Sequence, residues 1–204
     1  DGYYTDECIR TVRLPKLKKG MNELVLTLPY RKRSNLEWSY LLGEFGVRVS
    51  GNRARLVKKP GVPGFGDLGA QGFPFYGGNF TYLCEIEVPK GCYVLEIPKY
   101  RAPLVTVSVD GTEEQAAAFA PYRAELGELE GKHMLRITAY GSRVNTFGTV
   151  HLCDETVTWS GPNAWRTQGY QFSYEYQLKR TGILAGPVLY RREGLSRNAE
   201  RERG

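Results

Sequence analysis

The sequence predicts an all-β fold, on three observations. Apolar and polar residues alternate in many short segments, which is the pattern of strands with one buried face. The 204 residues include 24 glycines and 11 prolines, which suits tight turns between such strands. Apolar residues at helical spacing are almost absent. We therefore expect a β-sandwich, because 41% apolar residues and 14 tyrosines supply enough side chains for a sizeable core.

Ten segments are predicted as strands, and the clearest of them ends in a tight turn. Val105, Val107 and Val109 lie on one face of a strand that runs directly into Asp110 and Gly111. An Asp-Gly pair is typical of such turns, because both residues tolerate left-handed backbone angles. The predicted strands are residues 24–28, 47–49, 54–57, 82–88, 93–97, 104–109, 135–139, 148–152, 172–178 and 182–189.

The net charge of +6 raises the question of a nucleic-acid partner. The basic residues form short separate clusters, at 16–19, 31–33, 58–59 and 191–192, and none of the familiar nucleic-acid-binding motifs occurs. We interpret them as solvated charges at turns and expect no nucleic acid to bind. No window of about 18 apolar residues predicts a membrane span. Since the chain starts at Asp1 without an apolar leader, we expect a processed product or a piece of a longer protein.

The four cysteines do not predict a metal site. Cys8, Cys84, Cys92 and Cys153 contain no C-x-x-C pair, so we expect no zinc. Cys84 and Cys92 would face each other only if their strands formed a tight hairpin in the right register. We expect free and mostly buried thiols. No cofactor is predicted, and the sequence does not support a structural calcium ion.

Several motifs resemble one family when taken in order. Residues 107–111 (VSVDG) resemble the V-x-V-N-G turn of the sugar-binding jelly-roll domains found beside the catalytic domains of glycoside hydrolases. Residues 36–47 (LEWSYLLGEFGV), 72–82 (GFPFYGGNFTY) and 145–151 (NTFGTVH) resemble further segments of large bacterial proteins of that kind, including rhamnosidase-like ones. The sequence departs from the pattern where Asp110 replaces Asn, where Val144 replaces Arg, and where His151 lacks a second His beside it.

The resemblance implies a jelly-roll β-sandwich similar to galactose-binding domains, with additional N-terminal strands. A glycine followed by an alternating strand occurs at both Gly20 and Gly131, which favours two related units. We expect residues 1–58 to be N-terminal strands, either the closing part of a preceding jelly roll or additions to the next one. Residues 59–190, which begin at the Pro- and Gly-rich run 60–66, would form the complete jelly roll. Residues 191–204 have a single large apolar residue and are predicted to be a disordered tail.

One loop has the residue types that a sugar site requires. A sugar presents an apolar C–H face and a rim of hydroxyls, so its site needs an exposed aromatic ring beside planar hydrogen-bonding groups. The turn-rich stretch 159–170 has both kinds, and loops on a rigid sandwich are common binding sites. The alternative is that a tryptophan closes the end of the sandwich as part of its core. The candidate residues are Trp159, Asn163, Trp165, Arg166, Gln168 and Tyr170.

A second aromatic cluster supplies two further candidates for sugar binding. Tyr76 and Asn79 lie beside Phe73 and Phe75 in a glycine-rich segment. The alternative for this segment is a loop that folds back across the sandwich. His151 falls in a predicted strand and is interpreted as structural, whereas His133, at a predicted turn, is expected to be exposed to solvent.

The sequence predicts no catalytic residues. Glycoside hydrolysis needs two carboxyl groups that face each other across the bond, and the acidic residues are scattered. No G-x-S-x-G motif and no phosphate-binding loop occurs. We therefore expect a non-catalytic module whose partners are carbohydrate and the catalytic domain of its parent chain. The alternatives are an interaction domain without a ligand and a part of a glycosidase active site.

Overall fold

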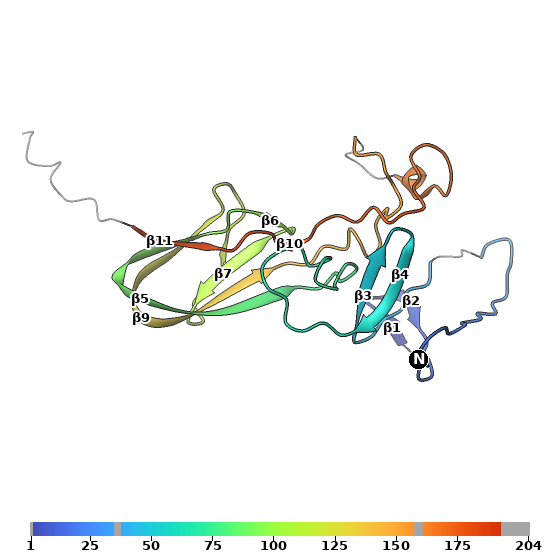
Figure 1. Cartoon of the computed structure of the whole chain (residues 1–204), viewed down its shortest axis with the longest axis horizontal. Coiled ribbons are helices and arrows are strands. Elements are labelled where there is room, and N and C mark those ends of the chain that lie inside the picture. Colours follow the sequence, from blue (N-terminus) through green and yellow to red (C-terminus); the bar gives the residue numbers. More distant parts are fainter. Residues whose placement is uncertain (1, 35–37, 157–160, 193–204) are drawn as a thin grey trace, which may run out of the picture. The chain divides into compact units, whose positions relative to one another are not determined.

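The computed structural model describes residues 2–34, 38–156 and 161–192, with the side chains of 162 and 163 excepted. The chain divides into two compact units, Asp1–Leu42 and Gly43–Gly204. Both are built from strands, and the helical structure described is one short 3-10 helix, η1 (Pro162–Trp165), so the prediction of an all-β protein is confirmed (Figure 1). The predicted tail at 193–204 lies outside the described residues, and 191–192 belong to a strand.

The first unit contains one hairpin, in which β1 (Gly2–Tyr4) pairs antiparallel with β2 (Asp6–Thr11). The predicted strand at 24–28 is wrong, because the described residues of this segment are neither in a strand nor paired with one. Leu24, Val25 and Leu26 are exposed instead. An alternating pattern permits a strand but does not provide the neighbouring edge that a strand must pair with.

The second unit begins with a regular hairpin. Strands β3 (Phe45–Ser50) and β4 (Arg53–Lys58) pair residue by residue, from Phe45 with Lys58 to Ser50 with Arg53. Gly51, with φ of 58°, begins the two-residue loop between them, where a left-handed residue favours glycine. The hairpin therefore belongs to the second unit, whereas the sequence analysis grouped it with the N-terminal strands.

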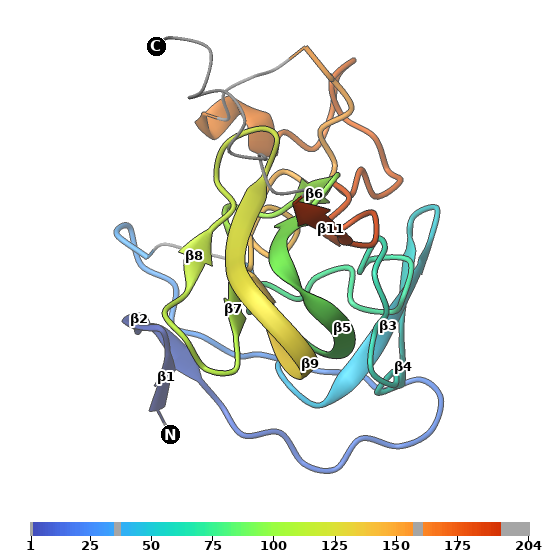
Figure 2. The same cartoon turned by 90° about the vertical axis from the view of Figure 1, so that its left-hand side faces the viewer.

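Two long strands form the centre of the second unit. Strands β5 (Phe80–Glu96) and β9 (Arg123–Ala139) are each 17 residues long and pair antiparallel along almost their whole length (Figure 2). The register shifts between Val88 and Gly91 and between Tyr93 and Val94, and such bulges bend a strand. The prediction of separate strands at 82–88 and 93–97 is wrong, because both belong to β5 and the stretch between them is a bulge within one strand.

Shorter strands extend this pair into a curled antiparallel sheet in the order β11-β5-β9-β7-β8. These are β7 (Val105–Val109), β8 (Gln115–Ala116) and β11 (Val188–Arg192). The predicted turn after β7 is confirmed, since Asp110 and Gly111 have φ of 49° and 78°. A separate two-stranded sheet pairs β6 (Tyr100–Arg101) with β10 (Gly182–Ile183).

Strand alternation places one apolar row of each central strand in a single core. On β7 the three valines are buried, and Ile137 of β9 pairs with Val107 on one side and Tyr82 of β5 on the other. The core contains Val88, Tyr93, Leu95, Ile97, Val105, Val107, Val109, Ala117, Ala124, Leu126, Leu129, Leu135, Ile137, Ala139 and Ile183.

The chain between β9 and β10 departs most from the predicted secondary structure. The segments 148–152 and 172–178 were predicted as strands, but among the described residues they share only an isolated bridge between Leu152 and Phe172. The predicted strand at 182–189 is two strands, β10 and β11, which belong to different sheets.

The cysteines are free, as predicted, but most of them are not buried. Cys8, Cys92 and Cys153 are exposed, and Cys84 is partly buried, which raises the pKa of its thiol.

Truncation of the central core residue tests this packing. Ile137 is 1% exposed, so Ile137→Ala should lower the free energy of unfolding by about 2–5 kcal/mol, through lost burial and the cavity left behind. Leu83 lies on the opposite face of β5 and is 64% exposed, so Leu83→Ala should change the free energy of unfolding by about 0.5 kcal/mol or less. Urea unfolding of both variants measures the two effects, and equal losses would contradict the assigned faces.

Candidate functional site

The candidate site lies in the long irregular segment between β9 and β10. A buried asparagine near the start of this segment is hydrogen-bonded to the backbone near its end. The side chain of Asn145 accepts a hydrogen bond from the Lys179 backbone N–H (2.9 Å) and donates one to the Lys179 carbonyl (2.7 Å). A Cβ at position 148 would collide with the Val144 carbonyl oxygen, so Gly148 permits the tight turn between these two residues. The motif at 145–151 therefore has a structural role in shaping this segment.

His151, the last residue of that motif, is held inside the segment. Its Nδ1 donates a hydrogen bond to the Ser173 carbonyl oxygen (3.0 Å), and the Ser173 N–H donates to the His151 carbonyl (2.8 Å). The imidazole also contacts the rings of Phe172 and Tyr176. The structural interpretation of His151 is therefore confirmed, although it does not lie in a strand.

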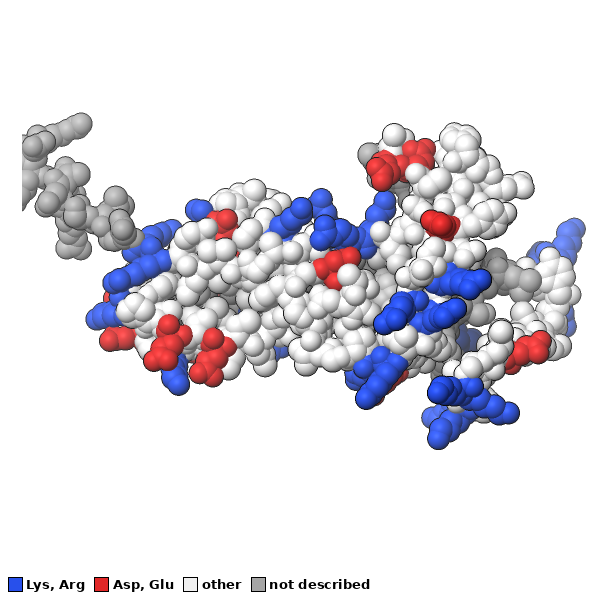
Figure 3. Space-filling model, in the orientation of Figure 1, with Lys and Arg blue, Asp and Glu red and all other residues white. Residues whose placement is uncertain are grey.

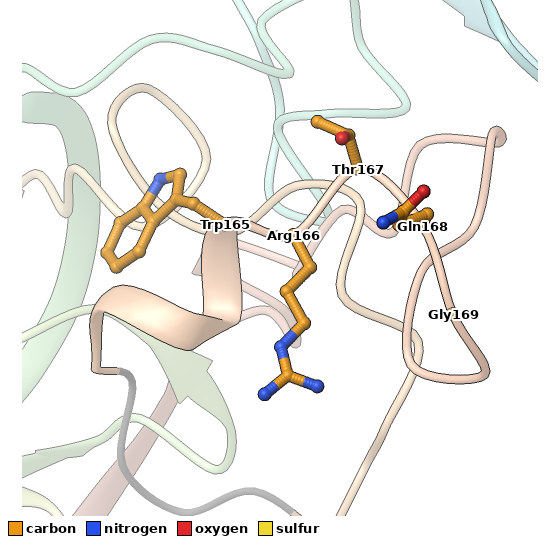
Figure 4. Close-up of a pocket in the computed structure, with 5 residues that line it drawn as sticks. All are labelled: Trp165, Arg166, Thr167, Gln168 and Gly169. Atoms are coloured by element: carbon orange, nitrogen blue, oxygen red, sulfur yellow. The ribbon is translucent and has the colours of Figure 1, made fainter.

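Three candidate residues line an open hollow at the outer part of this segment. Trp165 ends helix η1, and the hollow of about 550 Å³ is lined by Trp165, Arg166, Thr167, Gln168 and Gly169. The Trp165 side chain is 46% exposed. In Figure 4 the indole and the Arg166 side chain extend in different directions from the backbone. The hollow thus offers an aromatic face, a cation and an amide, but they do not converge on one enclosed point.

Two other candidates lie outside what the structure describes. Trp159 falls in the gap at 157–160, and the side chain of Asn163 is not described, although its backbone belongs to η1.

Tyr76 lines a different hollow from Trp165, a narrow crevice of about 10 Å³, and Asn79 is not among the residues that line it. The Tyr76 ring packs against Phe80 (4.7 Å between ring centres), and its hydroxyl donates to the Asn79 carbonyl (3.5 Å). The Asn79 Oδ1 accepts a hydrogen bond from the Gly141 N–H (3.0 Å). These contacts tie the segment 73–79 to the start of β5 and the end of β9. The structure therefore does not bring the two predicted clusters into one site.

His133 is not at a turn, as the sequence analysis expected, but within β9. Its side chain is 17% exposed and donates from Nδ1 to Asp110 Oδ2 (2.6 Å), while Asp110 Oδ1 accepts the Met134 N–H (2.8 Å). The hydrogen bond from His133 and the one from Met134 lower the pKa of Asp110. The hydrogen bond to Asp110 raises the pKa of His133. The pair therefore fixes the turn after β7 to β9.

Two other acidic side chains, Asp67 and Asp154, make backbone or local contacts. Asp67 Oδ1 accepts hydrogen bonds from the N–H groups of Gly69 (3.2 Å) and Thr181 (3.1 Å). Asp154 accepts from Thr156 and Gln171, and these hydrogen bonds lower its pKa. A general acid needs a raised pKa, so the shift at Asp154 runs in the opposite direction. Within the described residues, no group of three or more His, Cys, Asp or Glu side chains could hold a metal ion.

Charged side chains of both signs lie on the face of the molecule shown in Figure 3. Several form ion pairs, among them Arg123 with Glu96 (2.8 Å) and Arg192 with Glu125 (2.6 Å). In the described part of the chain, no helix has the length and apolar character needed to cross a membrane.

Comparison with known proteins finds no matching protein family, no matching curated protein and no matching solved structure. The resemblance to glycoside hydrolase-associated domains therefore remains a prediction that depends on the sequence motifs alone.

Titration of His133 tests its pairing with Asp110. The His133 imidazole should titrate with a midpoint above 6.5, because the neighbouring carboxylate favours its protonated form. Its contribution to stability is then fully present below about pH 6.5 and is lost as the pH rises through the raised pKa. Asp110→Asn should return the midpoint towards about 6.5. Proton NMR of the His133 imidazole signals measures the midpoint in the parent chain and in the variant, and an unchanged midpoint in the variant would contradict the pairing.

Proposed function

We propose that this chain is a non-catalytic, carbohydrate-associated module of a larger glycoside hydrolase-like protein. It binds glycan, or braces a catalytic domain of the same parent chain. The observation that carries the proposal is the half-exposed Trp165 in an open hollow beside Arg166 and Gln168.

The chemistry of this hollow suits a sugar. The indole offers a flat apolar surface on which the C–H face of a pyranose ring can stack. The Arg166 guanidinium carries five N–H donors, and the Gln168 amide can both donate and accept hydrogen bonds with hydroxyl groups. An open hollow also suits a glycan chain that lies along a surface, whereas a drug-sized ligand requires a more enclosed pocket.

A binding role agrees better with the acidic residues than a catalytic one does. Asp154 accepts hydrogen bonds that lower its pKa and so favour its ionised form. A retaining or inverting mechanism needs one carboxyl group that keeps its proton at working pH.

The jelly-roll class is the finer part of the proposal. The curled antiparallel sheet and its single enclosed core agree with a sandwich of this kind. An experimental structure in which the strands alternate between two facing sheets in jelly-roll order would support it.

A second candidate is an interaction domain that binds another protein domain and no sugar. The observation in its favour is the number of large apolar side chains exposed in the first unit, among them Met21, Val25 and Tyr30. Exposed apolar groups in such number are typical of surfaces that another molecule covers.

Glycan binding by the purified chain separates the two candidates. We expect binding to at least one member of a panel of galactose-, glucose-, xylose-, mannose- and rhamnose-based oligosaccharides. Trp165→Ala should weaken it about tenfold or more, because stacking on the indole is lost. Trp38, 62% exposed in the first unit, provides the matched control, and Trp38→Ala should leave the affinity unchanged.

Titration calorimetry measures the affinities. If no member of the panel binds, the glycan-binding proposal fails and the interaction domain is favoured. If Trp38→Ala and Trp165→Ala weaken binding equally, the hollow is not the site.

A further inference from the structure

Five aromatic rings form a continuous column of contacts, four of them in the segment between β9 and β10 and the fifth, Phe75, in the chain before β5. Phe75 contacts Tyr176 (5.6 Å between ring centres), Tyr176 contacts His151 (4.8 Å), and His151 contacts Phe172 (5.8 Å). Phe172 in turn contacts Tyr174 (5.0 Å), with the two rings at 74°. Such edge-to-face contacts are favourable for aromatic rings, so the column orders a segment that lacks regular strands.

Backbone hydrogen bonds fix the two chain segments that supply four of these rings, all except Phe75. The N–H of Cys153 donates to the Gln171 carbonyl (2.9 Å), and that of Gln177 donates to the Val150 carbonyl (2.7 Å). The bonds between His151 and Ser173 lie between them. The segments 150–153 and 171–177 are therefore held together on both sides of the column.

Tyr174 is the outer end of this column. Its side chain is 75% exposed, yet its ring is positioned by Phe172. Tyr170 is more exposed, at 86%, but within the described part of the chain its ring contacts no other aromatic ring. The two tyrosines therefore differ in how firmly the ring is held, and not in how accessible it is.

We propose that Tyr174 is a second sugar-stacking residue, separate from the hollow at Trp165, and that the ring column positions it for this role. The inference rests on the proposed function, since it assumes that the chain binds glycan. A ring that is already ordered loses little conformational freedom when a ligand stacks on it, so it binds more tightly than an equally exposed mobile ring.

This second platform also defines the ligand class. Trp165 and Tyr174 lie on one segment nine residues apart, and each can receive one sugar ring. The ligand is therefore an oligosaccharide with several pyranose units, and its affinity exceeds that of the corresponding monosaccharide.

The test compares three variants on the oligosaccharide of the panel that the chain binds best. Tyr174→Ala should weaken binding about 3- to 10-fold, which corresponds to the loss of one aromatic contact. Tyr174→Phe keeps the ring and should retain most of the affinity. Tyr170→Ala, the matched control, should have the smaller effect although Tyr170 is the more exposed residue. Calorimetry gives the affinities, and NMR spectra of each variant confirm that it is folded.

A fourth variant tests whether the column positions the ring. Phe172→Leu keeps an apolar contact but removes the ring that orients Tyr174, and it should weaken binding although Phe172 itself does not touch the sugar.

The outcomes separate this inference from the proposed function. If glycan binds and depends on Trp165, but Tyr174→Ala binds as tightly as the parent chain or Tyr170→Ala has the larger effect, the inference alone is overturned. If affinity for the monosaccharide equals that for the oligosaccharide, the second platform is overturned too. If no glycan binds, both the glycan-binding proposal and the inference fail.

Discussion

The pairing between β5 and β9 is the constraint on which the second unit depends. The two strands are 17 residues long, and their bulges let one ladder bend without ending. At one end of the pair β9 is hydrogen-bonded to β7, and at the other end β5 is hydrogen-bonded to β11. Each half of the pair therefore has a different neighbouring strand. The bend therefore closes the apolar rows around residues such as Val107, Leu95 and Ile137, whereas a flat sheet would leave one of its faces open.

Because the central pair ends at Ala139, the chain that follows is held by side chains and by separate backbone hydrogen bonds, and not by a continuous ladder. Asn145 bonds both backbone groups of Lys179, and Asp67 bonds the N–H of Thr181 just before β10 begins. His151 packs against the rings of Phe172 and Tyr176. This arrangement leaves Trp165 and Tyr174 on a surface that is ordered but not part of a sheet, where exposed rings can serve recognition without loss of core packing.

The sequence predicted well where the determining interactions are local. The valines of 105–109 and the Asp-Gly pair after them specify a strand and its turn through periodicity and backbone preference alone. The predictions failed where the structure of a segment depends on a pairing partner that is distant in the sequence. Residues 24–28 alternate as well as any strand, yet no edge pairs with the described residues of this segment. Pro89 and Gly91 have the composition of a turn, but β9 continues beside them and makes the stretch a bulge.

In the candidate site, too, residues marked by local composition could be predicted, whereas residues that depend on distant contacts could not. Trp165 could be proposed from sequence because a tryptophan in a Gly- and Pro-rich loop stands out by composition. Tyr174 could not, because 172–178 alternates like a strand and the importance of Tyr174 depends on its contact with Phe172 and, through it, His151. The resemblance pointed to His151 and Asn145, but their hydrogen bonds show that they shape the segment.

Native-state hydrogen exchange of the intact chain tests whether the second unit depends on the pairing between β5 and β9. We expect the amides paired between β5 and β9, such as those around Ile137, to exchange slowest and as one cooperative unit. The amides of 148–152 and 172–178 should exchange faster, with protection confined to bonds such as those of Cys153, Ser173 and Gln177. Slow exchange alternating along both of these segments, as in a paired ladder, would contradict the account.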